Sequence, residues 1–428
     1  MNLKYTVLLI TVFLVFFSFP PVITYDSSHY INYVHILEDP STLNLWDPVR
    51  GPMFPFLLFL IKHIFGFSPQ IFLAIQFILY IFTFHLLIKL NHTILKKKVI
   101  FISSFLFLFN PILIGYFHSV LTEIIAIPLL LLTTIFSLKI LNTNKNINKN
   151  IFIKNLLISS TLSVFTWQLK QPYYALFLFQ FLILVSMKLS KKENILFPAT
   201  ILLISLLSVV ISNHTWNKII QTTKDHPRSS QGLISRSIND SFKVIKDKGI
   251  SVFIRNTFKN YLAIANFYEI TFDKQAKPIT TNKIHIGNSN ENNLIGLRFL
   301  SDSENIIGGL GIIPEKQYSS YLQQINTDNY FLKDLIKKPV RFFNYFFTLS
   351  IILLPFITIY SFLTKQKILF LITGSSFLFL FMFAILSAQI DRYAIPIYPL
   401  LVFSISFLSI KTVTKKINNH RKNSYFTQ

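Results

Sequence analysis

The chain has 428 residues, of which 52% are hydrophobic and 16% aromatic, and its formal net charge is +23 at pH 7. One soluble core cannot bury so much apolar surface, and the absence of cysteine excludes disulfides and thiolate metal sites. Apolar runs of about 20 residues recur along the chain, and a run of that length crosses a hydrocarbon core of about 30 Å. The composition therefore predicts an all-α polytopic membrane protein.

The positive charge reports membrane topology rather than nucleic-acid binding. Residues 214–340 hold 17 of the 41 Lys/Arg and 11 of the 18 Asp/Glu, so this stretch is only mildly basic. The other 24 basic residues lie mostly in short loops between apolar runs, which is typical of cytoplasmic loops. We therefore expect membrane lipids as partners, and no nucleic acid.

The first apolar run, 3–24, begins near Lys4 and could be taken for a secretory signal. It has no small-residue cleavage site, so we expect a retained first span. The following outer juxtamembrane segment, 25–68, contains a short apolar stretch at 52–66. We expect this stretch to lie on the membrane surface, because a crossing there would move the Lys96–Lys98 cluster to the outer side.

The remaining apolar runs predict nine further spans, at 69–90, 98–117, 120–140, 152–169, 173–190, 194–213, 341–363, 367–388 and 393–412. These ten spans leave 19 of the 24 basic residues inside, together with both termini. The chain then divides into a seven-span module, an extracytoplasmic loop domain, three last helices and a cytoplasmic tail, at 1–213, 214–340, 341–412 and 413–428. Within the loop, 317–338 predicts an amphipathic helix, and 278–313 predicts irregular structure or short strands.

Three residues at the predicted outer face are candidates for chemistry. Asp26 follows the first span, where a carboxylate is costly to desolvate; an exposed loop acid is the alternative. Arg50 opens the segment RGPMFPFLLFL and can bind a lipid phosphate through two hydrogen bonds; contact with bulk headgroups is the alternative. Lys170, in WQLKQPYYA, suits a phosphate partner or simple snorkelling.

Two further groups share this face. Glu123 opens the fourth span after Thr122, where the helix dipole favours an anion, so capping alone could explain it. Asp391, Arg392 and Tyr393 occupy the turn before the last span, where the two charges could simply neutralise each other. Tyr30, His29 and His118 also fall on the outer side, but they are scattered and we expect no metal site.

In this order and on one side, these motifs resemble the GT-C superfamily of membrane glycosyltransferases, near the protein O-mannosyltransferase and aminoarabinose-transferase branch. Asp26 matches the Asp beyond the first span, and Arg50, Pro52 and Pro55 match a basic-x-Pro-x-x-Pro segment. Other matches are Thr122–Glu123, the Asp391–Arg392–Tyr393 turn with Pro396, and Lys170 with Pro172. Gln171 interrupts the last pair, where the family more often has Arg–Pro.

The resemblance implies a GT-C-like bundle of about ten helices with an outer juxtamembrane helix. It also implies inverting transfer of a sugar from a polyprenyl-phosphate-linked donor to a protein, lipid or glycan acceptor. Asp26 would be the general base, and Glu123 would orient the acceptor or a basic side chain. The cations at Arg50, Lys170 and Arg392 would bind the lipid phosphate, with Tyr30 and Tyr393 as further substrate contacts. The setting would be a bacterial inner (plasma) membrane, with the active site extracytoplasmic.

Two alternatives stay open at this point. An envelope polysaccharide polymerase of the O-antigen type also has about ten spans and a large outer loop, but does not need a carboxylate after the first span. A transporter or flippase of lipid-linked glycans would instead place ionisable residues near the bilayer midplane. No particular cofactor is indicated, and divalent-metal dependence is left open because no second acid adjoins Asp26.

Overall fold

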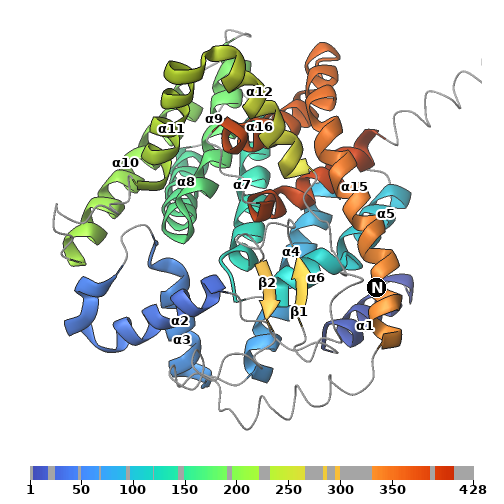
Figure 1. Ribbon diagram of the computed structural model, residues 1–428. Coiled ribbons are helices and arrows are strands. Elements are labelled where there is room, and N and C mark those ends of the chain that lie inside the picture. The colour runs from blue at the N-terminus through green and yellow to red at the C-terminus, as the bar shows by residue number, and fades with distance from the viewer. Residues whose placement is uncertain are drawn as a thin grey trace, which may run out of the picture.

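The computed structural model describes residues 3–17, 25–46, 50–66, 69–92, 97–118, 120–142, 149–189, 195–220, 232–265, 283–286, 295–298, 330–385 and 391–408. These residues are nearly all helical (Figure 1). The one sheet among them is a pair of four-residue antiparallel strands, β1 Lys283–Ile286 and β2 Ile295–Arg298.

Within the described ranges, six helices contain a stretch long and apolar enough to cross a membrane. They are α4 Pro69–His92, α7 Glu123–Asn142, α9 Tyr174–Leu189, α10 Leu196–Ile219, α15 Tyr330–Leu363 and α16 Lys367–Ile385. This confirms the expectation of an all-helical membrane protein, whereas the count of ten spans stays a prediction. Between α7 and α9 lies α8 Lys149–Leu169. The predicted amphipathic helix at 317–338 is described only from residue 330, where α15 begins; residues 317–329 lie outside the described residues.

The shorter apolar helices include α1 Leu3–Phe17, α3 Met53–Phe65, α5 Lys97–Leu108 and α6 Pro111–His118. A further short helix covers residues 398–408, and the 3-10 turn η5 Asp391–Ile397 leads directly into it. The expected first span, 3–24, is helical as far as Phe17, and 18–24 lie outside the described residues.

The expected single span at 98–117 is instead two helices, and the pair Asn110–Pro111 separates them. The Asn110 side chain caps α6 by accepting a hydrogen bond from the amide of Leu113 at 3.3 Å, and Pro111 is the first residue of α6. Proline has no amide hydrogen to give the carbonyl of Phe107, which accepts from the Asn110 amide at 3.3 Å and from the Tyr80 hydroxyl at 3.0 Å. The Tyr398 hydroxyl donates to the carbonyl of Leu106 at 3.2 Å.

Helix α7 is at the centre of the bundle. Of its most apolar stretch, 67% is buried, and the helix contacts α4, α8, α9 and η5. Polar side chains join it to α9, because Gln180 accepts from Ser137 at 2.9 Å and donates to Thr134 at 2.7 Å. Ser159 and Ser205 join α8 to α10 in the same way, at 2.9 Å. Such hydrogen bonds hold helices together where lipid weakens the hydrophobic driving force.

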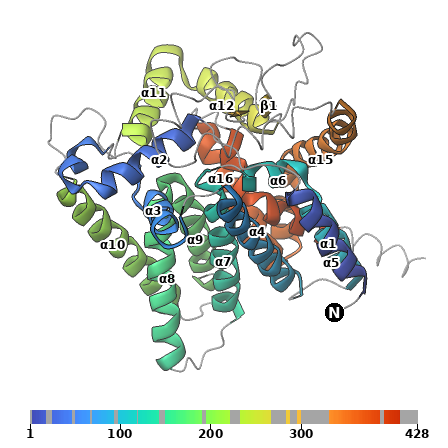
Figure 2. The same cartoon turned by 90° about the horizontal axis from the view of Figure 1, so that it is seen from below.

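A second layer lies across one end of the bundle. It includes α2 Tyr25–Glu38, α11 Gly232–Lys248 and α12 Ile250–Ala265, at the end opposite the point where α7 ends and α8 begins (Figure 2). Figure 2 shows α3 nearly end-on and α7 and α8 from the side, so α3 runs across the bundle axis. Its placement on the membrane surface stays a prediction.

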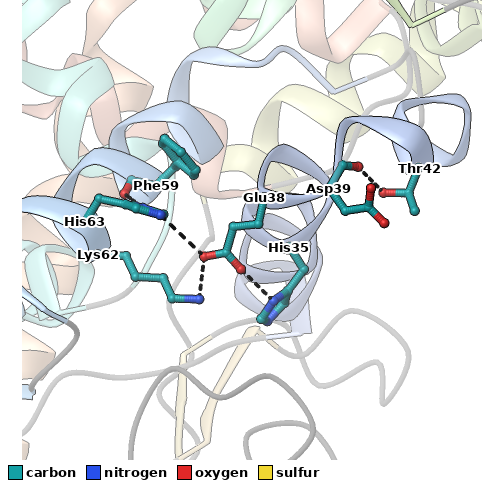
Figure 3. Close-up of polar contacts among 7 residues, drawn as sticks. All are labelled: His35, Glu38, Asp39, Thr42, Phe59, Lys62 and His63. Carbon is teal, nitrogen blue, oxygen red and sulfur yellow. Dashed lines mark hydrogen bonds and ion pairs between the residues drawn. The ribbon is translucent and has the colours of Figure 1, made fainter.

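A charged cluster fastens α2 to α3 (Figure 3). Glu38, the last residue of α2, accepts from Lys62 at 2.6 Å and from His35 at 3.2 Å, and His63 lies 4.0 Å away. Burial opposes ionisation of Glu38, but the hydrogen bond and charge of Lys62, with His35, outweigh it and hold the pKa of this carboxyl below its usual 4.5. Gly66 ends α3 at a φ of 71°, a conformation that favours glycine.

We expect Glu38→Gln to destabilise the protein slightly at neutral pH and not at all in acid. A lowered pKa in the folded state stabilises the fold above the unfolded-state pKa, and this stabilisation is lost as pH falls through the folded-state pKa. The pair is solvent-accessible, so the effect is at most about 1 kcal/mol. Melting temperatures of the detergent-solubilised protein across the acid range measure it, with Asp247→Asn on α11 as control. An equal loss at every pH would contradict the assigned cause.

Candidate functional site

The carboxylate of Glu123 is the centre of a polar cluster at the layered end of the bundle. Glu123 is the first residue of α7 and is fully buried. Its Oε1 accepts from the Tyr173 hydroxyl at 2.7 Å and from the Lys170 ammonium at 3.2 Å, and its Oε2 accepts from Thr122 at 3.1 Å. Two of the predicted site residues, Glu123 and Lys170, are therefore in direct contact.

The short turn between α8 and α9 brings Lys170 and Tyr173 to the same oxygen. Lys170 follows the last residue of α8 with an extended backbone, and the 3-10 turn η2 Gln171–Tyr173 leads directly into α9. Pro172 sits early in this turn, where its fixed φ suits it. The ammonium of Lys170 also lies 5.4 Å from the centroid of the Tyr173 ring, within range of a cation–π contact.

The cluster combines a buried anion with a cation that reaches solvent. An isolated buried carboxylate is costly, and the ammonium and two hydroxyls compensate its charge. The side chain of Lys170 is 13% exposed, whereas that of Glu123 is 0% exposed. Capping explains why an anion suits the start of α7, but the ion pair gives Glu123 a second role, which is to fix the position of Lys170.

The turn that carries Arg50 packs directly on the end of α8. A Cβ built on Gly51 would lie 1.7 Å from the carbonyl oxygen of Gln168, two residues before Lys170, so only glycine fits there. The Arg50 guanidinium lies 5.3 Å from the centroid of the Tyr30 ring, and the Trp46 indole donates to the Arg50 carbonyl at 2.8 Å. Tyr30 itself is buried.

Aromatic contacts hold the 3-10 turn η1 Pro40–Leu45 and its flanks against the bundle. Trp46 stacks on Tyr33 of α2 with ring centroids 4.2 Å apart and meets Trp216 of α10 edge-on at 5.1 Å. Gln168 donates to Ser212 of α10 at 2.8 Å. The segments bearing Arg50 and Lys170 are thus fixed to the same pair of helices, α8 and α10.

The other predicted site residues are located by backbone alone. Asp26 lies in the first turn of α2, and Asp391, Arg392 and Tyr393 open η5, which contacts α7. The positions of their side chains fall outside the described part of the chain. His118 faces α1 instead, with its Nε2 at 2.8 Å from the carbonyl of Phe16. Among the described residues, no group of three His, Cys, Asp or Glu side chains could hold a metal ion.

Tyr173 is the member of the cluster that the sequence did not single out. Its position after Lys-x-Pro, in a three-residue turn that keeps it close to Lys170, is a signal that the sequence does contain.

No protein-family model, curated protein or solved structure matches the chain. The class of the protein therefore rests on the six long apolar helices in the part of the chain that the structure describes, which indicate an integral membrane protein.

We expect Gly51→Ala to displace the juxtamembrane segment, because its Cβ would overlap a backbone carbonyl that cannot rotate away. The expected cost is at least about 2–3 kcal/mol of stability, measured as a lowered melting temperature in detergent. Gly374→Ala on α16 is the matched control, since its Cβ would lie 3.2 Å from the mobile tip of Ile183. A Gly51→Ala protein as stable as the control would contradict this packing.

We expect Tyr173→Phe to destabilise the protein by about 1–3 kcal/mol, because it removes a hydrogen bond to a buried charged group. The adjacent Tyr174→Phe is the matched control, since the buried Tyr174 hydroxyl bonds to none of the described residues. It should be neutral or slightly stabilising. Thermal unfolding of both variants in the same detergent measures the difference, and equal effects would argue against the Glu123 contact.

Proposed function

We propose that the protein is an inverting glycosyltransferase that moves a sugar from a polyprenyl-phosphate-linked donor to an acceptor on the outer face of the membrane. The observation that carries the proposal is the Glu123–Lys170 pair beside the Arg50 turn. The backbone that carries Arg50 packs against the end of α8, next to Lys170, so these two cationic residues lie on adjacent segments at one end of an apolar bundle. A phosphate attached to a long lipid needs cations at such a boundary, and it reaches them from the side through the membrane.

The proposed reaction breaks the bond between the anomeric carbon and the phosphate oxygen, and it forms a bond from the acceptor to that carbon. Asp26 takes the proton that the acceptor loses, as general base. The bonding pair leaves with the lipid phosphate, and Lys170, Arg50 and Arg392 stabilise its charge. The Tyr30 ring makes a cation–π contact with the Arg50 guanidinium and so helps to hold it in place. Tyr393 remains a proposed substrate contact.

Glu123 takes a positioning role in this scheme. Its carboxylate keeps Lys170 at one place near the surface and balances its charge while the site is empty. An arriving lipid phosphate then meets an ammonium whose position is already fixed. The acceptor, whether protein, lipid or glycan, is proposed to approach from the outer aqueous side. The membrane in question would be a bacterial plasma membrane.

We expect Asp26→Asn to lower transfer by about 10²–10⁴-fold, because amide nitrogen and oxygen cannot accept the proton. The measurement is release of polyprenyl phosphate from a labelled lipid-linked sugar in proteoliposomes. Asp39→Asn is the matched control. Asp39 caps η1 by accepting from the Ser41 amide at 3.1 Å, and asparagine caps equally well, so this variant should keep full activity.

Two results would separate the proposal from its rivals. Full transfer by Asp26→Asn at normal protein level would point to a polymerase that needs no base after the first span. A wild-type protein that moves labelled lipid across the membrane, and never releases polyprenyl phosphate with any acceptor tried, would point to a transporter.

A further inference from the structure

The helix α12 has one face docked on the membrane-spanning bundle. Asn260 donates to the carbonyl of Ala384 at 3.0 Å, and the Tyr261 hydroxyl donates to the carbonyl of Ile351 at 2.9 Å. Ser241 of α11 donates to the carbonyl of Ile385 at 2.9 Å. Through these bonds, both helices of the 232–265 hairpin are attached to α15 and α16.

A second face of α12 carries large apolar side chains that are exposed. They recur every four residues: Ile250 is 65% exposed, Ile254 48%, Phe258 61% and Leu262 53%. Positions four apart advance by about 40° around a helix, so these side chains form one continuous stripe next to the docked face. Phe242 of α11 is likewise 66% exposed.

A third face of α12 is basic. Arg255 and Lys259 each follow a stripe residue by one position, which places them about 100° further around the helix, and both are exposed. Exposed lysines also end α11, at Lys243, Lys246 and Lys248. Going around α12, the order is therefore docked face, apolar stripe, basic face.

The docking partners set the depth of α12. Ala384 and Ile385 are the last two residues of one candidate span, Lys367–Ile385. Ile351 is the seventh residue of another, Tyr345–Leu363, which is about 9 Å inside its end at a rise of 1.5 Å per residue. Helix α12 is thus bonded near the end of each of two candidate spans, where the hydrocarbon of a membrane would meet the headgroups.

We propose that the 232–265 hairpin is a membrane-interface element, with the apolar stripe of α12 in the acyl chains of the adjacent leaflet. Arg255 and Lys259 then reach the headgroup phosphates, as in helices that lie in the plane of a membrane surface. Large exposed apolar patches on a protein mark contact with a membrane or another protein, and the depth and the basic face of α12 favour lipid. This inference does not depend on the proposed reaction.

The chain allows a direct test because its 428 residues include no cysteine. Phe258→Cys and Ile254→Cys place a nitroxide on the stripe, and Lys259→Cys and Arg255→Cys place it on the basic face. Each variant is reconstituted in nanodiscs of phosphatidylethanolamine and phosphatidylglycerol. Electron paramagnetic resonance then measures collisions of the label with oxygen, which concentrates in lipid, and with a water-soluble nickel chelate.

We expect labels at 254 and 258 to favour oxygen severalfold over nickel relative to labels at 255 and 259. All four sites are exposed, so the labels do not disturb packing, and agreement within each pair guards against one misfolded variant. Stripe labels that collide freely with nickel would overturn the proposal, because the stripe would then face water. Stripe labels shielded from both reagents would overturn it as well, because another protein segment would cover the stripe.

Discussion

The buried carboxylate of Glu123 is the constraint on which this end of the molecule depends. A carboxylate without access to water must find a cation and hydrogen-bond donors within the protein, and one short turn supplies the cation and the Tyr173 hydroxyl. Lys170 and Tyr173 can contact Glu123 only if the first residue of α7 lies next to the turn between α8 and α9. The end of α8 fixed in this way is the surface on which Gly51 packs, so the juxtamembrane segment takes its position from the same ion pair.

Away from this end, the helices are held by small polar contacts spread along their lengths. Gln180 between Ser137 and Thr134, and Ser159 against Ser205, occur inside otherwise apolar interfaces. Each contact gives hydrogen-bond partners to polar groups that lipid and apolar side chains could not bond. The directions of these hydrogen bonds allow few other ways for one helix to slide along the next. The bundle is thus specified by many modest directional contacts, while the start of α7 depends on one buried ion pair.

Local pattern in the sequence was enough to find the apolar helices and to single out Glu123 and Lys170, but not their contact. These two residues are 47 positions apart, and no periodicity links the start of one helix to the end of the next. Tyr173 was missed because its one signal, a place after Lys-x-Pro in a short turn, does not show which side chain its hydroxyl contacts. The break at Asn110–Pro111 was readable from capping rules, yet the continuous apolar run concealed it. The stripe of α12 was concealed as well, because the mixed charge of 214–340 suggested a domain in water.

The break between α5 and α6 also bears on the order of assembly. The carbonyl of Leu106 is satisfied by the hydroxyl of Tyr398, a residue 292 positions later in the chain. A ribosome makes Leu106 long before it makes Tyr398, so this carbonyl lacks that donor until a further 292 residues have been added. The helix that carries Tyr398 therefore completes the hydrogen bonding of a helix end that was made much earlier, so the break between α5 and α6 reaches its final form late in synthesis.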